Sequence, residues 1–391
     1  MTTDDVTSIL PPDHDRAVLV ARVWDSATGG PRPALVRGQD VHDLFPLAPT
    51  VSDLLEREDV LELVAGVDGP PRWRLDELVS ASSERRTDRS HLLAPVDLQV
   101  VKACGVTFVD SMIERVIEER AAGDPDRAAH IRETVAGVLH EELDGVKPGT
   151  PAAQRVKEVF VAEGLWSQYL EVGLGPHPEV FTKAPVLSSV GYGAHVGIPH
   201  FSSWNNPEPE LVLVVDSAGR ARGATLGNDV NLRDVEGRSA LLLGMAKDNT
   251  GSSALGPFVR LFDSGFTLDT LRTERVTMRV EGPSDGFVMD GVNNVSRLSR
   301  PFEDLIAATY GSHHQYPDGF ALYTGTLFAA TKDRDVPGAG FTHKPGDLVS
   351  ISSRHLGTLV NEVAPTHEIA RWEFGIRSLF EYLETVGAVA R

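Results

Sequence analysis

Short apolar runs separated by turn residues constrain the fold of this chain more than any other feature. Residues 276–280 and 347–352 alternate between apolar and polar side chains, as half-buried strands do. Residues 211–216 and 221–225 flank a Ser-Ala-Gly turn and predict a β-hairpin. The 36 glycines and 25 prolines among 391 residues supply the turns that many short strands require. The sequence therefore predicts a β-rich α+β protein rather than a helical bundle.

Helical patterns are confined to a few stretches. Residues 109–117 place apolar side chains on one face at helical spacing, and a second helix is expected at about 126–142. A third helix is expected to begin at Thr150-Pro151, because a hydroxyl residue followed by proline is typical of a helix start. Residues 296–310 also read as one helix.

The length of 391 residues suggests more than one domain. Residues 1–95 are expected to form a small N-terminal domain, with strands at about 17–24 and 33–36 and a capped helix start at 50–56. Residues 96–391 are expected to form the larger domain, which carries most of the predicted strands.

Charge and cysteine content exclude several classes of function. Lysine plus arginine is 37 and aspartate plus glutamate is 56, so the formal net charge is −19. Such an acidic surface repels phosphate backbones and anionic lipids, so neither a nucleic-acid partner nor a membrane partner is expected. One cysteine, Cys104, cannot form an internal disulfide. The acidic residues 1–5 do not resemble a signal peptide, and a cytoplasmic protein is expected.

The most specific local pattern is a pair of glutamates between prolines. Prolines favour an extended chain, in which Glu208 and Glu210 point to the same face. Two like charges so close need a cation or protons, and Mg²⁺ prefers oxygen ligands. Asp229, which follows the hairpin, is the expected third carboxylate, with Arg233 and Asp234 as a supporting ion pair. The alternative is that the two glutamates are ordinary surface residues.

Two further segments could contact a ligand. Lys247 precedes a run of small polar residues at 248–254, and a desolvated lysine there could have a lowered pKa and act as a base. Thr324, Gly325 and Thr326 offer two hydroxyls around a glycine, which could hold a carboxylate. The alternatives are a solvated lysine and an ordinary turn. No GxGxxG, P-loop, CxxC or GxSxG motif is present, so nucleotide, zinc-ribbon and serine-hydrolase functions lack support.

Taken in order along the chain, these segments resemble the fumarylacetoacetate hydrolase superfamily over about residues 98–385. The segments that carry the resemblance are Phe181–Pro185, Glu208–Leu211, Gly227–Asp234, Lys247, Thr324–Thr326, Gly346–Val349 and Leu356–Asn361. The resemblance implies a mixed β-sandwich roll with a Mg²⁺ or Mn²⁺ ion bound by Glu208, Glu210 and Asp229. It also implies a 2-keto acid substrate that binds through its carboxylate and keto oxygens.

One motif departs from the carbon–carbon hydrolases of this superfamily. Residues 105–114 resemble their GxNYxxHxxE segment, in which the histidine activates water with help from the glutamate. Ser111 occupies the histidine position, and Glu114 matches the glutamate. A serine hydroxyl is not a general base near neutral pH, so hydrolysis is in doubt while metal binding is not.

The chain is also longer than the short hydrolases, with a helical insertion at about 118–175. In these features it resembles a bacterial subgroup that dehydrates 2-keto-3-deoxy-D-xylonate to 2-oxoglutarate semialdehyde in non-phosphorylating pentose catabolism. The resemblance implies a hydro-lyase in which Lys247 takes the C3 proton and Glu114, beside Ser111, protonates the departing C4 hydroxyl. The residues expected to hold the substrate are Lys183, Arg233, Thr324, Gly325 and Thr326.

Other activities stay open at this point. The alternatives are a metal-dependent hydrolase or decarboxylase of another 2-keto or 2,4-diketo acid, and a non-catalytic binding protein on the same fold. The configuration of the substrate at C4, its chain length and the choice between Mg²⁺ and Mn²⁺ are also open. From the habit of the family we expect a homodimer or homotetramer.

Overall fold

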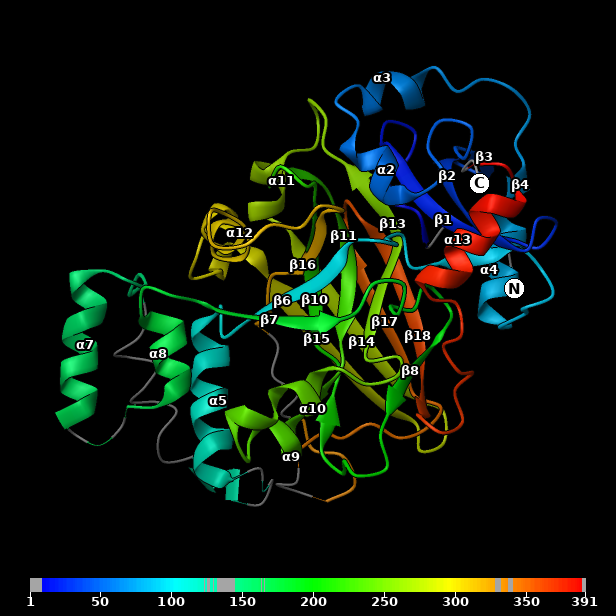
Figure 1. Cartoon of the computed structure of the whole chain (residues 1–391). Helices are drawn as coiled ribbons and strands as arrows, with labels where there is room; N and C mark the ends of the chain where they lie inside the picture. The colour runs from blue at the N-terminus through cyan, green and yellow to red at the C-terminus, as the bar shows by residue number, and fades with distance from the viewer. Residues whose placement is uncertain are drawn as a thin grey trace.

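Two β-sheets in contact with each other form the centre of the molecule (Figure 1). The computed structural model describes residues 9–122, 124, 127, 128, 130, 131, 145–162, 164, 166–327, 332–336 and 340–388. Most neighbouring strands are antiparallel, and the β16–β6 and β18–β8 pairs are parallel. The predicted β-rich α+β architecture with a mixed β-sandwich is therefore confirmed.

The large sheet has the order β4-β3-β2-β1-β13-β11-β10-β16-β6-β7, and β5 pairs with β1 outside this path. Its strands are β1 (Leu19–Asp25), β2 (Gly30–Arg37), β3 (Asp40–Asp43), β4 (Trp73–Arg74), β5 (His91–Leu93), β6 (Val100–Gly105), β7 (Glu179–Ala184), β10 (Pro209–Val215), β11 (Ala221–Asp229), β13 (Ser253–Leu261) and β16 (Phe320–Tyr323).

The second sheet has the order β15-β14-β17-β18-β8, and a short ribbon joins β9 to β12. These strands are β8 (His195–Ile198), β9 (Asn205–Asn206), β12 (Asn231–Leu232), β14 (Arg275–Gly282), β15 (Phe287–Asn294), β17 (Leu348–Ser353) and β18 (Gly357–Pro365). The predicted hairpin and the predicted strands near 276–280 and 347–352 are present.

Strand alternation divides the apolar side chains between two cores. Leu211 and Leu213 of β10 belong to the same buried cluster as Met278 of β14, which lies between the two sheets. Val212 and Val214 point to the opposite face of the large sheet. There they join a cluster that includes the helices α2 (Val51–Glu56) and α3 (Val60–Ala65).

The N-terminal strands extend the large sheet. β1 pairs with β13 through Leu19 and Arg260, so the sheet runs from the N-terminal region into the rest of the chain. The helix α4 (Leu75–Ser83) of this region and the C-terminal helix α13 (Ile376–Thr385) lie near the two labelled ends of the chain in Figure 1. The proposed domain boundary near residue 95 stays a prediction.

Three helices form a separate layer beside the edge strand β7 (Figure 1). They are α5 (Val109–Ala121), α7 (Pro151–Ala162) and α8 (Gln168–Leu174), and they share an apolar cluster. The helices expected at 109–117 and from Thr150-Pro151 are confirmed. Most of the helix expected at 126–142 lies outside the described residues.

The prediction of one helix over residues 296–310 is wrong. A short 3₁₀ turn, η2 (Val295–Arg297), is separated from α12 (Phe302–Thr309) by non-helical residues that end at Pro301. Proline has no N–H to donate and disfavours helix for the residue before it, so one helix cannot continue through residues 300 and 301.

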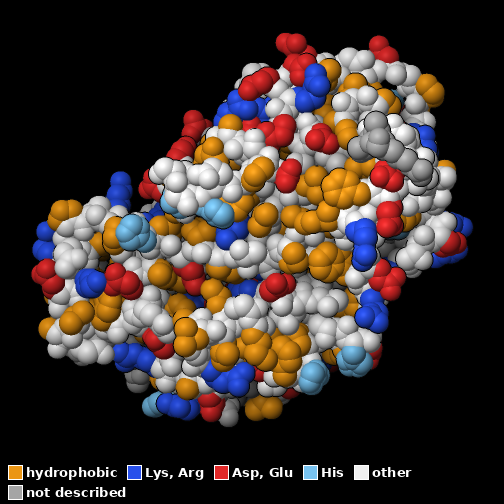
Figure 2. All heavy atoms as spheres, in the orientation of Figure 1, with side chains coloured by type: hydrophobic (Ala, Val, Ile, Leu, Met, Phe, Trp, Pro, Cys, Tyr) orange, Lys and Arg blue, Asp and Glu red, His pale blue; other side chains and the backbone are white. Residues whose placement is uncertain are grey.

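The remaining short helices are α9 (Arg233–Glu236), η1 (Ala240–Leu242), α10 (Leu243–Lys247) and α11 (Leu268–Arg272). No helix among the described residues is long and apolar enough to cross a membrane. Figure 2 shows acidic and basic side chains dispersed over one face of the molecule, with apolar groups between them.

Candidate active site

Three carboxylates converge at the base of the β10–β11 hairpin. Glu208 precedes β10, Glu210 lies in it, and Asp229 ends β11, where its N–H donates to the Glu208 carbonyl at 3.0 Å. One oxygen from each carboxyl group lies within 4.8 Å of the others, and all three side chains are buried. The convergence expected from the extended chain and the hairpin is therefore found.

This cluster is an unfavourable place for negative charge unless a cation is present. Burial raises the pKa of Glu210 well above its ordinary value, and Asp229 and Glu208 raise it further. Burial also raises the pKa of Glu208, although Lys247 and Arg115 oppose this effect. A hard divalent cation prefers carboxylate oxygens and would relieve the repulsion. The donor set therefore fits Mg²⁺ or Mn²⁺.

Lys247 stands directly against two of the carboxylates. Its Nζ donates to Glu208 Oε2 at 2.5 Å and to Asp229 Oδ2 at 3.0 Å. Burial alone would lower the pKa of Lys247, but Asp229 and Glu208 outweigh burial and raise it above its ordinary value. The lowered pKa expected of a lysine base is not found, because the same burial that desolvates the ammonium also supplies its two counter-charges.

Lys183 lies behind Asp229 and does not line the pocket described below. Its Nζ forms a 2.6 Å ion pair with Asp229 Oδ1 and donates to the carbonyls of Val230 at 3.1 Å and Lys247 at 2.5 Å. These acceptors use the three donors of an ammonium group. Burial lowers the pKa of Lys183, with Asp229 opposing. In this geometry Lys183 orients Asp229, and the expected contact of Lys183 with the substrate stays a prediction.

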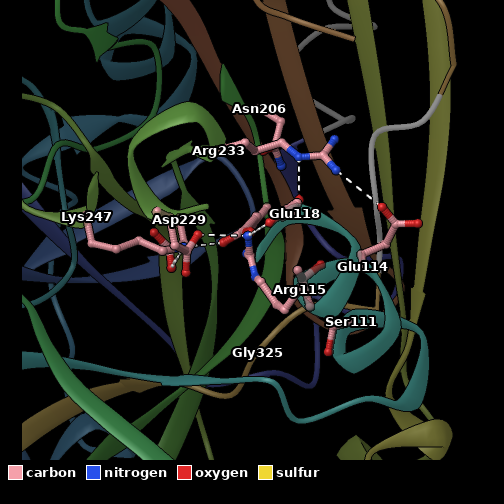
Figure 3. Close-up of polar contacts among 12 residues, drawn as sticks. Ser111, Glu114, Arg115, Glu118, Asn206, Asp229, Arg233, Lys247 and Gly325 are labelled. Carbon is pink, nitrogen blue, oxygen red and sulfur yellow. Dashed lines mark hydrogen bonds and ion pairs between the residues drawn. The ribbon is translucent and has the colours of Figure 1, made fainter. Parts of the chain in front are cut away.

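Arg115 of α5 binds carboxylates from three parts of the chain. Its guanidinium contacts Glu118 Oε2 at 2.6 Å, Glu208 Oε1 at 2.7 Å and Glu236 Oε2 at 2.8 Å. Figure 3 shows Arg115 reaching from the helix toward the carboxylates. The guanidinium fork suits several carboxylates at once, and it fixes the helical layer to the metal-binding candidates.

Arg233 joins α9 to α5 rather than to its neighbour Asp234. Its Nε donates to Glu118 Oε1 at 2.6 Å, and its Nη2 donates to Glu114 Oε2 at 3.3 Å (Figure 3). Asp234 accepts from the hydroxyl of Ser202 at 2.8 Å. Consecutive helical side chains point about 100° apart, which separates the two. No ion pair between Arg233 and Asp234 occurs in the part of the chain that the structure describes, so that expectation was wrong.

Ser111 lines the pocket and Glu114 does not. The Ser111 hydroxyl donates to the Phe108 carbonyl at 2.8 Å and accepts from the Phe108 N–H at 3.2 Å. These bonds close the first turn of α5, so Ser111 has a structural task although it also lines the pocket. Glu114 is held by Arg233 and does not line the pocket. A catalytic role for either residue stays a prediction.

The segment Thr324-Gly325-Thr326 supports the carboxylates. The Gly325 N–H donates to Glu210 Oε2 at 2.6 Å. Gly325 has a φ of +95°, and a Cβ there would lie 1.9 Å from Thr107 Oγ1, so this position requires glycine. The hydroxyl of Thr324 donates to a carbonyl of β10 at 2.9 Å and that of Thr326 to another at 3.2 Å. Gly325 and Thr326 line the pocket.

One pocket brings these groups together. Its lining residues are Cys104, Gly105, Val106, Ser111, Arg115, Glu179, Phe181, Glu208, Glu210, Asp229, Glu236, Lys247, Gly325 and Thr326. Sequence reasoning missed Arg115, Glu179 and Glu236. Glu179 stands two residues before the phenylalanine of the FxKxP segment, which is a signal that could have found it. The other two depend on how the helices pack. A pocket with a carboxylate cluster and a buried lysine is typical of metal-dependent enzymes.

Comparisons with known proteins agree with this class. A family model described as fumarylacetoacetate (FAA) hydrolase C-terminal matches residues 153–364. The chain is 31% identical over 222 residues to a 2-dehydro-3-deoxy-D-arabinonate dehydratase of Saccharolobus solfataricus, with 56% of this chain and 70% of the relative covered. It is 29% identical over 288 residues to a probable 2-keto-3-deoxyxylonate dehydratase of Haloferax volcanii, with 73% of this chain and 91% of the relative covered.

Solved structures share the fold. The apo form of 2-keto-3-deoxy-D-arabinonate dehydratase superimposes with a TM-score of 0.61 at 22% identity, covering 91% of this chain and 100% of that one. The same enzyme complexed with magnesium and 2,5-dioxopentanoate gives a TM-score of 0.60 at 20% identity, covering 89% and 99%.

The chain belongs to the fumarylacetoacetate hydrolase family, as the order of its motifs predicted. The two relatives are named as a dehydratase and a probable dehydratase, which are hydro-lyases, and the chain is an enzyme of that class.

Proposed function

We propose that this protein is a divalent-cation-dependent dehydratase that converts a 2-keto-3-deoxy-pentonate to 2-oxoglutarate semialdehyde. The observation that carries the proposal is the pocket itself, where Glu208, Glu210 and Asp229 converge while the position of the hydrolytic histidine is taken by Ser111. A cation site without the water-activating histidine suits elimination better than hydrolysis.

The names of the relatives point to one acid. One relative is named for the D-arabinonate-derived acid and the other for the xylonate-derived acid. D-Arabinonate and D-xylonate differ in configuration only at C2 and C3. A keto group at C2 and a methylene at C3 remove both differences, so in the D series the two names describe the same compound. We therefore propose the five-carbon acid with the D configuration at C4 as the substrate.

A cation, Mg²⁺ or Mn²⁺, would be held by Glu208, Glu210 and Asp229. When bound, it supplies Lewis-acid stabilisation of the negative charge that develops on the C2 keto oxygen. Three carboxylates leave about three positions of an octahedral ion for substrate and water. The chain's own residues orient the ligands: Arg115 holds Glu208, and Lys183 holds Asp229.

Lys247 supplies positive charge beside the substrate in this proposal. Its raised pKa keeps the ammonium protonated while Glu208 and Asp229 face it. Of the two roles open to it, counter-charge and C3 base, the contacts at 2.5 and 3.0 Å favour the first. A fixed ammonium in a water-poor pocket stabilises an enolate without reorganisation.

The test is a product assay on protein stripped with EDTA. The substrates are 2-keto-3-deoxy-D-pentonate, its C4 epimer and a 2,4-diketo acid, each with and without added Mg²⁺. We expect metal-dependent formation of 2-oxoglutarate semialdehyde from the D acid, with slower turnover of the epimer. Cleavage of the diketo acid without semialdehyde from either pentonate would replace the dehydratase with a hydrolase. The homodimer or homotetramer stays a prediction.

A further inference from the structure

Glu210 has the fewest partners of the three convergent carboxylates. Glu208 and Asp229 each form ion pairs with two cationic side chains. In the part of the chain that the structure describes, one hydrogen bond ends on the Glu210 carboxyl group, and it comes from the N–H of Gly325 at 2.6 Å. The position of this carboxyl group therefore depends on the position of the Gly325 backbone.

Asn293 of β15 joins the Gly325 backbone to the strand that carries Glu210. Its Nδ2 donates to the carbonyl of Pro209 at 3.0 Å and to that of Gly325 at 3.2 Å. Its Oδ1 accepts from the N–H of Leu327 at 3.1 Å. The side chain is 1% exposed, and it reaches from the second sheet to the first residue of β10 in the large sheet. One amide thus connects the two sheets at the carboxylate cluster.

The neighbours of this amide fix its orientation. A carbonyl oxygen can only accept a hydrogen bond and a backbone N–H can only donate one. Rotation of the amide by 180° would therefore set its oxygen against two carbonyls and its NH₂ group against the N–H of Leu327. Asparagine is the only side chain of this length that offers two donors and an acceptor. The pattern of contacts at position 293 is thus specific for asparagine.

The Pro209 carbonyl belongs to the peptide bond that leads into Glu210. It accepts from Asn293 and also from the hydroxyl of Thr326, at 3.2 Å, so both of its lone pairs have a donor. Asn293 and Thr326 therefore hold the plane of this peptide. The plane sets the direction in which the Glu210 side chain leaves β10.

Gly325 needs support from outside its own segment. Its φ of +95° lies in the region that glycine alone adopts readily, and glycine is the least restrained residue of a chain. Its N–H donates to Glu210, and its carbonyl accepts from Asn293. The contact with Asn293 restrains the peptide unit after Gly325 and limits rotation of the N–H before it. Asn293 thus acts on the Glu210 side chain at both of its ends.

We propose, resting on the divalent-cation site of the function above, that Asn293 is a positioning residue that sets the cation affinity of this site. It touches neither the cation nor the substrate, and it acts through the Pro209 peptide and the Gly325 N–H. Without the amide, the Glu210 carboxyl group has more positions to lose when the cation binds. Loss of a residue that orients a metal ligand typically weakens metal binding by about 10- to 100-fold.

The experiment measures Mg²⁺ affinity by calorimetry on full-length protein stripped with EDTA. The variants are Asn293→Leu, which removes all three hydrogen bonds at similar size, and Asn293→Ser, whose hydroxyl can replace one donated bond. The matched control is Asn361→Leu on β18. Asn361 is also 1% exposed and donates to two carbonyls at 3.0 Å, those of Gly191 and Ala194, but it does not lie along the pocket.

We expect Asn293→Leu to weaken Mg²⁺ binding by about 10- to 100-fold and Asn293→Ser to weaken it less. Asn361→Leu should bind Mg²⁺ within about threefold of wild type. Both leucine variants should melt at lower temperature than wild type, because each leaves buried carbonyls without a donor. Turnover of Asn293→Ser should fall at low Mg²⁺ and recover most of the wild-type kcat at saturating Mg²⁺, which a general loss of stability would not produce.

Equal Mg²⁺ affinity of wild type and Asn293→Ser, together with unchanged affinity of any folded Asn293→Leu, would overturn the positioning role. An equal loss of affinity in Asn361→Leu would also overturn it, because the effect would then come from destabilisation alone. If Asn293→Leu does not fold, the serine variant decides. A wild type that binds Mg²⁺ but forms no semialdehyde from the pentonate would end the dehydratase proposal, and the affinities would still test Asn293.

Discussion

The guanidinium of Arg115 donates a 2.7 Å hydrogen bond to Oε1 of Glu208, so a helix outside the sandwich holds one of the three convergent carboxylates. The same side chain contacts Glu118 and Glu236. Charge balance at the site therefore extends beyond the cation and the two lysines. Docking of α5 and the geometry of the candidate metal site depend on one another.

Removal of Arg115 should destabilise the protein. Arg115→Ala would leave Glu118, Glu208 and Glu236 buried with less compensating charge, and breaking a buried pair costs about 3–5 kcal/mol. The free energy of unfolding by urea measures this. The control is Arg74→Ala, whose exposed partner is Asp40, and it should change stability by less than about 1 kcal/mol. Equal effects of the two variants would contradict the buried network.

Divalent cations should stabilise the folded protein. Binding only to the native state raises the free energy of unfolding by about 2.7 kcal/mol when the cation is present at about 100 times its Kd. Thermal unfolding of EDTA-treated protein with and without Mg²⁺ checks this. Glu210→Gln removes one oxygen donor of the cluster and should abolish the shift, whereas Asp76→Asn on the exposed face of α4 should keep it. A shift that survives in Glu210→Gln would place the cation elsewhere.

The free energy of unfolding of the metal-free protein should depend on pH through the titration of Glu179. Its folded pKa of about 7 lies above the ordinary 4.5, so between these values the native state binds more protons than the unfolded state. Stability contributed by this group therefore falls as pH rises from about 4.5 to about 7, by about 3 kcal/mol in all. Urea unfolding of wild type and Glu179→Gln across this range should show a steeper fall in wild type, because Glu208 and Glu210, whose pKa values are also raised, titrate in both proteins. Parallel curves would contradict the raised pKa.

Gly105→Ala should disturb Glu179 specifically. The new Cβ would meet the carboxyl group at 1.9 Å, and the end of this flexible side chain can turn away at little cost in stability. Turnover should fall, because the Glu179 carboxyl group, which lines the pocket, must leave its position. The control is Gly66→Ala after α3, where the nearest atom to a Cβ is a carbonyl oxygen at 3.5 Å. If Gly105→Ala has the turnover of wild type, the close packing of Glu179 does not matter for the reaction.

The parts of the protein that sequence predicts well are those set by neighbouring residues. Glu208, Glu210 and Asp229 are joined by one hairpin, so alternation along β10 and the antiparallel return of β11 bring them together. Thr50 before α2 and Thr150 before α7 mark helix starts through local hydrogen bonds. The failure at 296–310 is also local, because Pro301 breaks the helix that apolar spacing suggested.

What only the tertiary structure decided is which charges meet across the chain. Arg115 and Glu208 are 93 residues apart, and Arg233 and Glu118 are 115 apart. Periodicity gives the faces of a helix but not the partner against which it packs, so these pairs are not visible in the sequence. The raised pKa values of Lys247 and Glu179 follow from that packing, because burial and neighbouring charge decide whether a group holds a proton.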